Sequence, residues 1–536
     1  MRTDIPSFRY AVSFDTATLP IERTDVVVVG SGSAALRAAL AAHDAGAGVL
    51  VLTKREPEAC NTNYAQGGIA AAIGPGDSIE AHLRDTLEAG RGLADPAFVR
   101  GVLADGAQRV LELIDWGAQF DRRGGSIAFA QEGGHGRPRI LHAKGDATGA
   151  EIERTLLARA RRLHLRIRPD CCAVDLLTFG GRCVGVLARD GRSGRLLAVF
   201  ARAVILATGG AGQLWRETTN PDVATFDGPA MAWRAGATLA DLEFMQFHPT
   251  TLYVAGASRA LVSEAVRGEG GILRDRFGRR FMRELHPRAE LAPRDVVSRC
   301  ILHQMRKTGD TQVYLDVTHI PARVFRARFP QIAMTCAQYA LNPARDLIPV
   351  RPSAHYMLGG VRTDAEGRTD LPGLYACGEA AATGFHGANR LGSNSLLECL
   401  VFGRRAGMAA VSDTHRRPPA RPVRIVARSA PRKDALIDVS DVLNALRSVM
   451  WREVGVERTE EGLRFALGQI AFWQRYILDK AFGDVAGLEL RNQLTIGRLV
   501  AASALRRRES RGVHFRTDHP KADDCRWDRR LFVKRT

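Results

Sequence analysis

The chain has 536 residues, of which 45% are hydrophobic and 25% are charged, and its formal net charge is +18 at pH 7. At about 150 residues per domain, this length predicts three or four globular domains with a large core. The arginines are scattered and no stacking aromatic residues alternate with them, so the charge favours a solvated basic surface over a nucleic-acid-binding one.

Nine cysteines form no C-x-x-C pair, which argues against an iron–sulfur cluster or a zinc ribbon and favours reduced thiols in a cytosolic protein. We read residues 1–24 as an N-terminal extension, because they lack the apolar core of a signal peptide. No run of about 18 apolar residues occurs. We therefore expect a cytoplasmic protein that binds neither a metal nor a membrane.

An apolar run at 26–29 is followed by the glycine turn GSGSAALRAAL and by a second apolar run, VLVL. This order predicts a βαβ unit. Gly30 and Gly32 allow a tight turn that approaches a pyrophosphate at the helix N-terminus. The second strand ends in Thr53 and Lys54, where an acidic ribose ligand is usual. Lys54 then either faces a phosphate or ribose or is simply solvated.

Two further apolar runs, AVILATGG at 203–210 and GLYACGEAA at 373–381, are typical of strands in the same domain. We therefore predict an α/β fold whose Rossmann-like dinucleotide domain is discontinuous, at 25–254 and 352–414, with an insertion at 255–351. The Arg/Pro-rich stretch 415–434 has the composition of a linker. Helical periodicity after residue 439 predicts a separate helical domain at 435–536.

Eight motifs follow one another along the chain: GSGSAALRAAL, NYAQGGIAAAIG, ATGGAGQLW, QFHPTTLY, SEAVRGEGG, LAPRDVVSR, HYMLGGV and FHGANRLGSNSLLECLVFG. Together they resemble the flavoprotein family of succinate dehydrogenase, fumarate reductase and L-aspartate oxidase over residues 25–410. ESRGVHFRTDHP at 509–520 resembles the C-terminal domain of that family. The resemblance implies a Rossmann-like FAD-binding domain, an inserted α+β capping domain and a C-terminal helical domain.

The resemblance also implies a set of FAD-binding residues. For two of them, Asp227 and Glu379, helix capping is the simpler alternative. The full set is Gly30, Ser31, Gly32, Ser33, Ala34, Lys54, Asn61, Thr62, Asn63, Tyr64, Ala65, Gln66, Gly67, Gly68, Asp227, Glu379, Ser395 and Leu396. In membrane-bound relatives, a histidine five residues before the glutamine of A-Q-G-G attaches FAD covalently. That position is Asn61 here, and an amide cannot form the bond. We therefore expect non-covalent FAD, as in the soluble aspartate oxidases.

A dicarboxylate substrate needs cationic or donor groups at both ends. The positions that match the family's substrate-binding residues are His248, Ser263, His355 and Arg390. Arg294 matches the proton-transfer arginine of the family. An arginine is a poor base in water, so this role requires a desolvated site and an exit for the proton. Glu264 and Arg267 match the family's proton relay, and the alternative for them is an ion pair on the surface.

The resemblance implies oxidation of L-aspartate to iminoaspartate by FAD. Oxygen, giving hydrogen peroxide, or fumarate, giving succinate, would accept the electrons. The product would feed quinolinate synthase in NAD biosynthesis. A soluble fumarate reductase or succinate-oxidising flavoprotein is the main alternative. A nucleic-acid-associated flavoprotein, suggested only by the charge, and a non-catalytic assembly subunit fit the motifs less well.

One acidic residue separates aspartate from succinate as the substrate. The segment AQEGGHGR at 130–137 places Glu132 among glycines, and it resembles the version of this segment in aspartate oxidases, in which the glutamate faces the substrate ammonium. Succinate has no group that needs such a carboxylate. The simpler alternative is a loop ion pair between Glu132 and Arg137 or Arg139.

Overall fold

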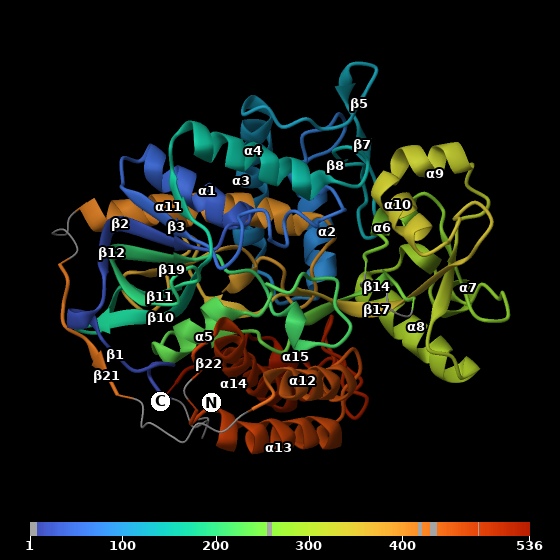
Figure 1. Cartoon of the computed structure of the whole chain (residues 1–536). Coiled ribbons are helices and arrows are strands. Elements are labelled where there is room, and N and C mark those ends of the chain that lie inside the picture. Colours follow the sequence, from blue (N-terminus) through green and yellow to red (C-terminus); the bar gives the residue numbers. More distant parts are fainter. Residues whose placement is uncertain (1–7, 255–259, 416–420, 429–436, 481, 536) are drawn as a thin grey trace.

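The computed structural model describes residues 8–254, 260–415, 421–428, 437–480 and 482–535. A seven-stranded sheet lies at its centre (Figure 1). Strands β12, β2, β3 and β9 run parallel in that order, and the antiparallel hairpin β10–β11 continues the sheet beyond β12. The strands are β2 (Ile21–Val29), β3 (Val49–Leu52), β9 (Arg166–Arg168), β10 (Cys171–Phe179), β11 (Arg182–Asp190), β12 (Leu196–Leu206) and β19 (Leu374–Ala376).

Strand β19 pairs in parallel with the C-terminal half of β12. Segments about 170 residues apart in sequence, around Leu206 and Ala376, therefore lie side by side in one sheet. The strand predictions at 203–210 and 373–381 are confirmed. The strands end at Leu206 and Ala376, shortly before Gly209 and Gly378, and both ends lie at the edge of the sheet that carries the glycine turn after β2.

Two layers cover the central sheet because strand side chains alternate between its faces. Val26 and Val28 pack into one hydrophobic core, with α1, α3, α4 and α11, whereas Val27 and Val29 pack into the other, with α5 and the C-terminal helices. Figure 1 shows α1 and α11 on one side of the sheet and α5 and α14 on the other. The covering helices are α1 (Ser33–Asp44), α3 (Pro96–Asp115), α4 (Thr148–Arg162), α5 (Asp227–Arg234) and α11 (Asn394–His415).

The expected N-terminal extension is wrong at its boundary, because β2 begins at Ile21 and not at residue 25. Its first five residues are exposed or half-buried, and they lack the continuous apolar run that marks the rest of the strand. Upstream, β1 (Phe14–Asp15) pairs with β21 (Val426–Ala427), which belongs to the predicted linker. The rest of the predicted linker lies largely outside the described residues.

The insertion forms a lobe beside the sheet (Figure 1). Its antiparallel sheet has the order β14-β17-β16-β15, and its helices pack around a separate hydrophobic core. The predicted boundary between 351 and 352 falls inside β17. The elements are β14 (Met245–Leu252), α6 (Glu264–Gly268), β15 (Ile272–Arg274), α7 (Met282–Leu285), α8 (Arg294–Thr308), β16 (Val313–Asp316), α9 (Ala322–Arg328), α10 (Pro330–Gln338) and β17 (Ile348–Met357).

Three long helices follow the linker, as the periodicity predicts: α12 (Val439–Glu453), α13 (Glu460–Ile477) and α14 (Val485–Arg506). The end of the chain departs from the helical prediction. After the short α15 (Asp524–Trp527), β22 (Phe532–Val533) pairs with β13 (Leu239–Ala240) in a four-stranded sheet that also holds β18 (Gly360–Arg362) and β20 (Ala381–Ala382).

Smaller elements complete the fold between β3 and β9. Helix α2 (Ile79–Gly90) packs against α3. Three short strands form one sheet and two form a hairpin, and they are β4 (Ile69–Ala70), β5 (Arg122–Arg123), β6 (Ser126–Ile127), β7 (Phe129–Ala130) and β8 (Ile140–Leu141). No helix in the described part of the chain is long and apolar enough to cross a bilayer.

Candidate functional site

The turn after β2 brings the backbone against the start of α1. Gly30 has a φ of +120°, and a Cβ built on it would lie 2.2 Å from the Ala207 carbonyl oxygen, so only glycine fits there. Gly32 precedes the first turn of α1 and provides no side-chain cap. The N–H of Ser33 is instead bound by Thr62 Oγ1 at 3.0 Å. The remaining free N–H groups of the first helical turn favour an anion at this position.

A first cavity of about 870 Å³ opens at this turn. It is lined by ten of the predicted cofactor residues: Gly30, Ser31, Gly32, Ser33, Ala34, Lys54, Asn61, Thr62, Asp227 and Glu379. A second cavity of about 880 Å³ shares Asn61, Thr62 and Glu379 with it, so the two adjoin one another. The second is also lined by Tyr64, Ala65, Gln66, Gly67, Gly68, Ser395 and Leu396, by the predicted substrate residues His248, Ser263, His355 and Arg390, and by the predicted proton-transfer residues Glu264 and Arg294.

Three predicted residues lie behind these cavity walls. Asn63 belongs to the loop that lines the second cavity, but its side chain lines neither cavity. Glu132 and Arg267, from other segments, also line neither cavity.

Lys54 is half-buried and belongs to an ion cluster, so the alternative of a simply solvated side chain is wrong. Its ammonium donates to Asp227 at 2.9 Å and to Glu489 of α14 at 2.5 Å, as well as to Thr225 at 2.7 Å. Burial alone would lower the pKa of Lys54, but the two carboxylates raise it above its ordinary value. The cluster fastens the end of β3 to the C-terminal helices, at the wall of the first cavity. Asp227 also accepts from Asn492 at 2.8 Å.

Asn61 and Glu379 join the two cavities. The Asn61 amide donates to Glu379 Oε2 at 3.1 Å, and the Met357 N–H donates to Oε1 at 2.9 Å. Burial raises the pKa of Glu379 to about 7 despite these two donors. The other amide atom, Asn61 Oδ1, is buried and has no partner among the described residues. Glu379 is therefore a hydrogen-bonded wall residue of both cavities, and helix capping does not account for its position.

The two histidines of the second cavity are held neutral. Burial keeps the pKa of both His248 and His355 well below the ordinary value, and the nearby Arg294 lowers it further. Their rings lie 5.1 Å apart. Thr219 Oγ1 lies 2.8 Å from His355 Nδ1, and His248 Nε2 is buried without a partner in the described structure. His248 Nε2 is thus free to bind a ligand in the cavity.

Arg390 adds a second cation to the same wall. Its guanidinium donates to Ser395 at 3.1 Å and lies 4.5 Å from the ring centroid of Tyr356, while its Nε is buried without a partner among the described residues. Burial, and then the charge of Arg294, lowers the pKa of Arg390 to about 10, so it stays protonated at neutral pH. Neither contact neutralises it, so a ligand carboxylate would be attracted to this wall.

Arg294, Glu264 and Arg267 form a buried chain, and the surface ion pair expected as the alternative is wrong. Glu264 accepts from Arg294 at 2.7 Å and from Arg267 at 2.9 Å, and its side chain is only 2% exposed. Burial alone would raise the pKa of Glu264, but the two arginines outweigh it and hold the pKa below its ordinary value. Arg267 also donates to the carbonyl of Glu290.

Glu132 is buried, and the ion pair with Arg137 or Arg139 is wrong. Arg139 donates instead to Asp77 and Asp85. Glu132 Oε2 accepts from Ser393 at 2.9 Å. Oε1 is buried with no hydrogen-bond partner in the part of the chain that the structure describes, and it lies 3.7 Å from the His142 ring nitrogen. Gly67 provides no side chain to cover this oxygen, since a Cβ there would lie 4.0 Å from it.

Gly392 is the point at which these groups meet. A Cβ on Gly392 would lie 3.1 Å from Glu264 Oε2, 3.2 Å from Arg294 Nη2 and 3.4 Å from Glu132 Oε2. The predicted proton-transfer residues and the predicted ammonium acceptor therefore converge, although they lie more than 130 residues apart in the chain.

Sequence reasoning missed several side chains that hold this site. Gln246 accepts from Arg294 at 3.2 Å, and Tyr356 lies against Arg390 and donates to Glu398 at 2.6 Å. Both lie inside motifs that the sequence already marks, QFHPT and HYMLGG, next to the histidines chosen from them. Ser393 lies inside the last motif. Their types gave no reason to select them without the fold.

The residues fit FAD. A diphosphate needs a glycine turn at a helix N-terminus, which Gly30 and Gly32 provide. The long molecule needs an extended site, which the two adjoining cavities provide. Asn61 Oδ1 and Gln66 Oε1 are buried without a partner among the described residues, so both are free to accept hydrogen bonds from a polar ring system.

Comparison with known proteins agrees with this fit. Residues 25–396 match the FAD binding domain family, and residues 443–536 match the fumarate reductase flavoprotein C-terminal family. An L-aspartate oxidase of Streptomyces coelicolor is 45% identical, covering 95% of this chain and 91% of the relative. One of Pseudomonas aeruginosa is 42% identical, covering 92% and 95%.

Solved structures resemble the whole fold. An E. coli quinol fumarate reductase FrdA variant has a TM-score of 0.90 at 31% identity, covering 96% of each chain. Mycobacterium smegmatis Sdh1 has a TM-score of 0.82 at 32% identity, covering 96% of this chain and 95% of that one. The chain belongs to the L-aspartate oxidase family, within the flavoproteins of succinate dehydrogenase and fumarate reductase.

Proposed function

We propose that this protein binds FAD non-covalently and oxidises L-aspartate to iminoaspartate. Oxygen, giving hydrogen peroxide, or fumarate, giving succinate, accepts the electrons. FAD, when bound, supplies the two-electron acceptor for this reaction. The site belongs to a cytoplasmic enzyme of NAD biosynthesis whose unstable product passes to quinolinate synthase.

The observation that carries this proposal is the charge of the second cavity. Arg294 and Arg390 are cations in its wall, and His248 and His355 are held neutral between them. Each charge-assisted bond from an arginine to a carboxylate contributes about 1.5 to 3 kcal/mol. Arg390 and His355 bind one carboxylate of L-aspartate, and His248 and Ser263 bind the other.

Arg294 moves the proton. In the direction that reduces fumarate, Arg294 donates a proton from its guanidinium to the substrate. Glu264 then passes a proton from Arg267 to Arg294. Oxidation runs the same chain in reverse. The 2.7 Å and 2.9 Å contacts support this transfer, because each lies within hydrogen-bond reach. Burial of all three side chains removes the water that would make arginine a poor proton-transfer group.

Glu132 makes the site selective for an amino acid. Its carboxylate lies beside Arg294 and Glu264 around Gly392, and one of its oxygens has no partner. The ammonium of L-aspartate satisfies that oxygen. Succinate leaves it unpaired in a buried site, which costs about 1 to 3 kcal/mol or more for a charged group. This feature favours aspartate oxidation over a soluble fumarate reductase or a succinate-oxidising flavoprotein.

Asn61 supports non-covalent binding of FAD, because an amide side chain cannot form the covalent bond that a histidine at this position would form. Acid precipitation of the purified holoenzyme should release the yellow cofactor into the supernatant. Flavin retained in the pellet would contradict the non-covalent assignment without touching the substrate assignment.

Product analysis tests the reaction. With L-aspartate and oxygen, the holoenzyme should release hydrogen peroxide together with oxaloacetate and ammonia, the hydrolysis products of iminoaspartate. D-Aspartate should give none of these products. Peroxide formation from succinate at a rate equal to that from L-aspartate would instead favour the succinate-oxidising alternative.

A further inference from the structure

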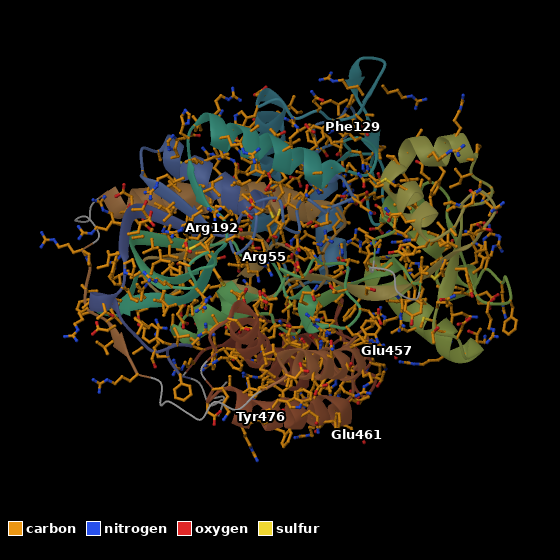
Figure 2. All side chains as sticks on the ribbon, viewed as in Figure 1. Arg55, Phe129, Arg192, Glu457, Glu461 and Tyr476 are labelled. Carbon is orange, nitrogen blue, oxygen red and sulfur yellow. The ribbon has the colours of Figure 1, made fainter. Side chains whose placement is uncertain are left out.

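The outward face of α13 is unusual for a solvated helix. Thr459 caps the start of α13 by accepting from the Gly462 N–H at 3.0 Å, and its inner side packs against α12 and α14. The outer side carries one stripe of exposed residues, which we term the α13 stripe: Glu461, Phe465, Gly468, Phe472 and Arg475. Figure 2 shows Glu461 at the lower edge of the molecule, on this helix.

The spacing of the stripe, four, three, four and three residues, follows the helical repeat. At about 100° per residue, the five positions fall within an arc of roughly 80°. Phe465 is 48% exposed and Phe472 is 57% exposed. They are the two large apolar side chains that α13 exposes, and both belong to this arc.

Gly468 lies at the centre of the stripe with open space around it. A Cβ built there meets no atom within 4 Å. Glycine in an exposed helix interior costs about 1 kcal/mol relative to alanine, so nothing within the monomer accounts for its use at this position. A glycine flanked by two exposed phenylalanines instead allows a second helix to approach closely.

The stripe is complementary to itself when two copies run antiparallel across Gly468. Glu461 and Arg475 each lie seven residues, about 10.5 Å, from the glycine, on opposite sides. Each Glu461 then faces Arg475 of the other copy. Phe465 and Phe472 lie about 4.5 and 6 Å from the centre, so each Phe465 meets Phe472 of the other copy.

Within one chain these charges are not used. Neither Glu461 nor Arg475 forms an ion pair with a residue in the described ranges, whereas the neighbouring Arg464 is paired with Glu460 at 2.7 Å. A two-fold axis at Gly468 would pair both charges twice, as an isologous interface requires.

We propose that the α13 stripe is an interface through which two copies of this chain associate, antiparallel and two-fold symmetric about Gly468. An 18-residue helix is about 27 Å long, so the contact is smaller than a standard interface and the dimer is weak and dependent on concentration. The inference is independent of the proposed reaction, because it uses no residue of either cavity.

Sedimentation velocity of the FAD-loaded protein across the micromolar range tests the interface. Phe472→Ser should weaken the dimer by at least about tenfold, since buried aromatic residues dominate such contacts. The matched control is Phe277→Ser, at a phenylalanine that is 76% exposed and lies outside the stripe. A protein that stays monomeric throughout, or a dimer that Phe472→Ser leaves unchanged, overturns the proposal.

Charge reversal tests the antiparallel register. Glu461→Arg and Arg475→Glu should each weaken the dimer, because each places like charges opposite one another twice. The double variant should restore the dimer to within about threefold of the original, since it exchanges the two charges. Failure of the double variant to recover, while its flavin content and thermal stability are normal, contradicts the pairing.

Cross-linking tests the position of the axis. The cross-linking variant carries Cys525→Ser, which removes the exposed cysteine, together with Gly468→Cys. A short bis-maleimide should link the cysteine at position 468 of one copy to the same position of the second copy. Met408→Cys on α11, also exposed, is the control and should stay uncross-linked. Equal cross-linking at both positions, or none at Gly468→Cys, overturns the symmetry that we propose.

Discussion

Glu132→Gln is the substitution that best isolates the recognition of the substrate ammonium. Glutamine has the same shape as glutamate and keeps an oxygen that can accept from Ser393, so the loop and its packing are preserved. The change removes the negative charge and replaces one acceptor oxygen with an amide NH2 group that cannot accept from an ammonium. The effect on activity should therefore report the charge and not a loss of structure.

The expected magnitude follows from the position of the carboxylate. A hydrogen bond to a charged group contributes about 1.5 to 3 kcal/mol, or roughly 10- to 150-fold. Glu132 is 3% exposed, which preserves the interaction, but it lies behind Ser393 and does not line the cavity wall. The lower part of the range therefore applies. We expect kcat/KM for L-aspartate to fall about 10- to 30-fold.

Fumarate carries no ammonium, so its reduction provides the internal comparison. Fumarate reduction by a reduced dye should change by less than about threefold in Glu132→Gln. Glu153→Gln is the matched control, because Glu153 is also buried but lines neither cavity, and burial raises the pKa of that carboxyl well above its ordinary value. Equal loss of both activities in Glu132→Gln would refute the assignment of Glu132 to the ammonium.

Three further substitutions test the cradle, the proton chain and the buried acid. Arg294→Leu should lower turnover at least about 10³-fold while flavin absorbance stays normal, and near-normal turnover would reject its role. Gly30→Ala should yield protein without flavin, because its Cβ would overlap the Ala207 carbonyl; normal flavin content would contradict this. Burial raises the pKa of Glu379 to about 7 in the folded protein. Between about pH 4.5 and 7, Glu379 therefore ionises in the unfolded state but not in the folded state. The free energy of unfolding of the apoprotein should decline by at most about 3 kcal/mol as the pH rises through this range. Glu379→Gln should remove that decline in chemical denaturation, and an identical pH profile would refute the assignment.

The sequence predicts the cofactor cradle well because its chemistry is local. The glycine turn and the helix after it are contiguous in the sequence. The carbonyl that leaves room only for glycine at Gly30 belongs to Ala207, directly after β12, and the apolar run of β12 is itself visible in the sequence. The start of β2 gives a weaker sequence signal than the rest of the strand, since Ile21 is followed by four polar residues. The sequence therefore predicts a later start for this strand than the structure shows.

The partners of a charged side chain are set by contacts that no local pattern reveals. Lys54 pairs with Asp227 and Glu489, which lie 173 and 435 residues away. The expectation of a solvated basic surface is also incomplete, because several arginines are fully buried, among them Arg139 and Arg267. Their carboxylate partners neutralise charge that the composition counts as exposed.

Anaerobic mixing of the FAD-loaded protein with L-aspartate, D-aspartate and succinate, in parallel, tests the central claim most directly. Loss of the flavin absorbance near its visible maximum measures transfer of electrons from each compound in the absence of any acceptor. We predict rapid bleaching by L-aspartate and none by D-aspartate, with succinate far slower. Bleaching by succinate alone would contradict the account.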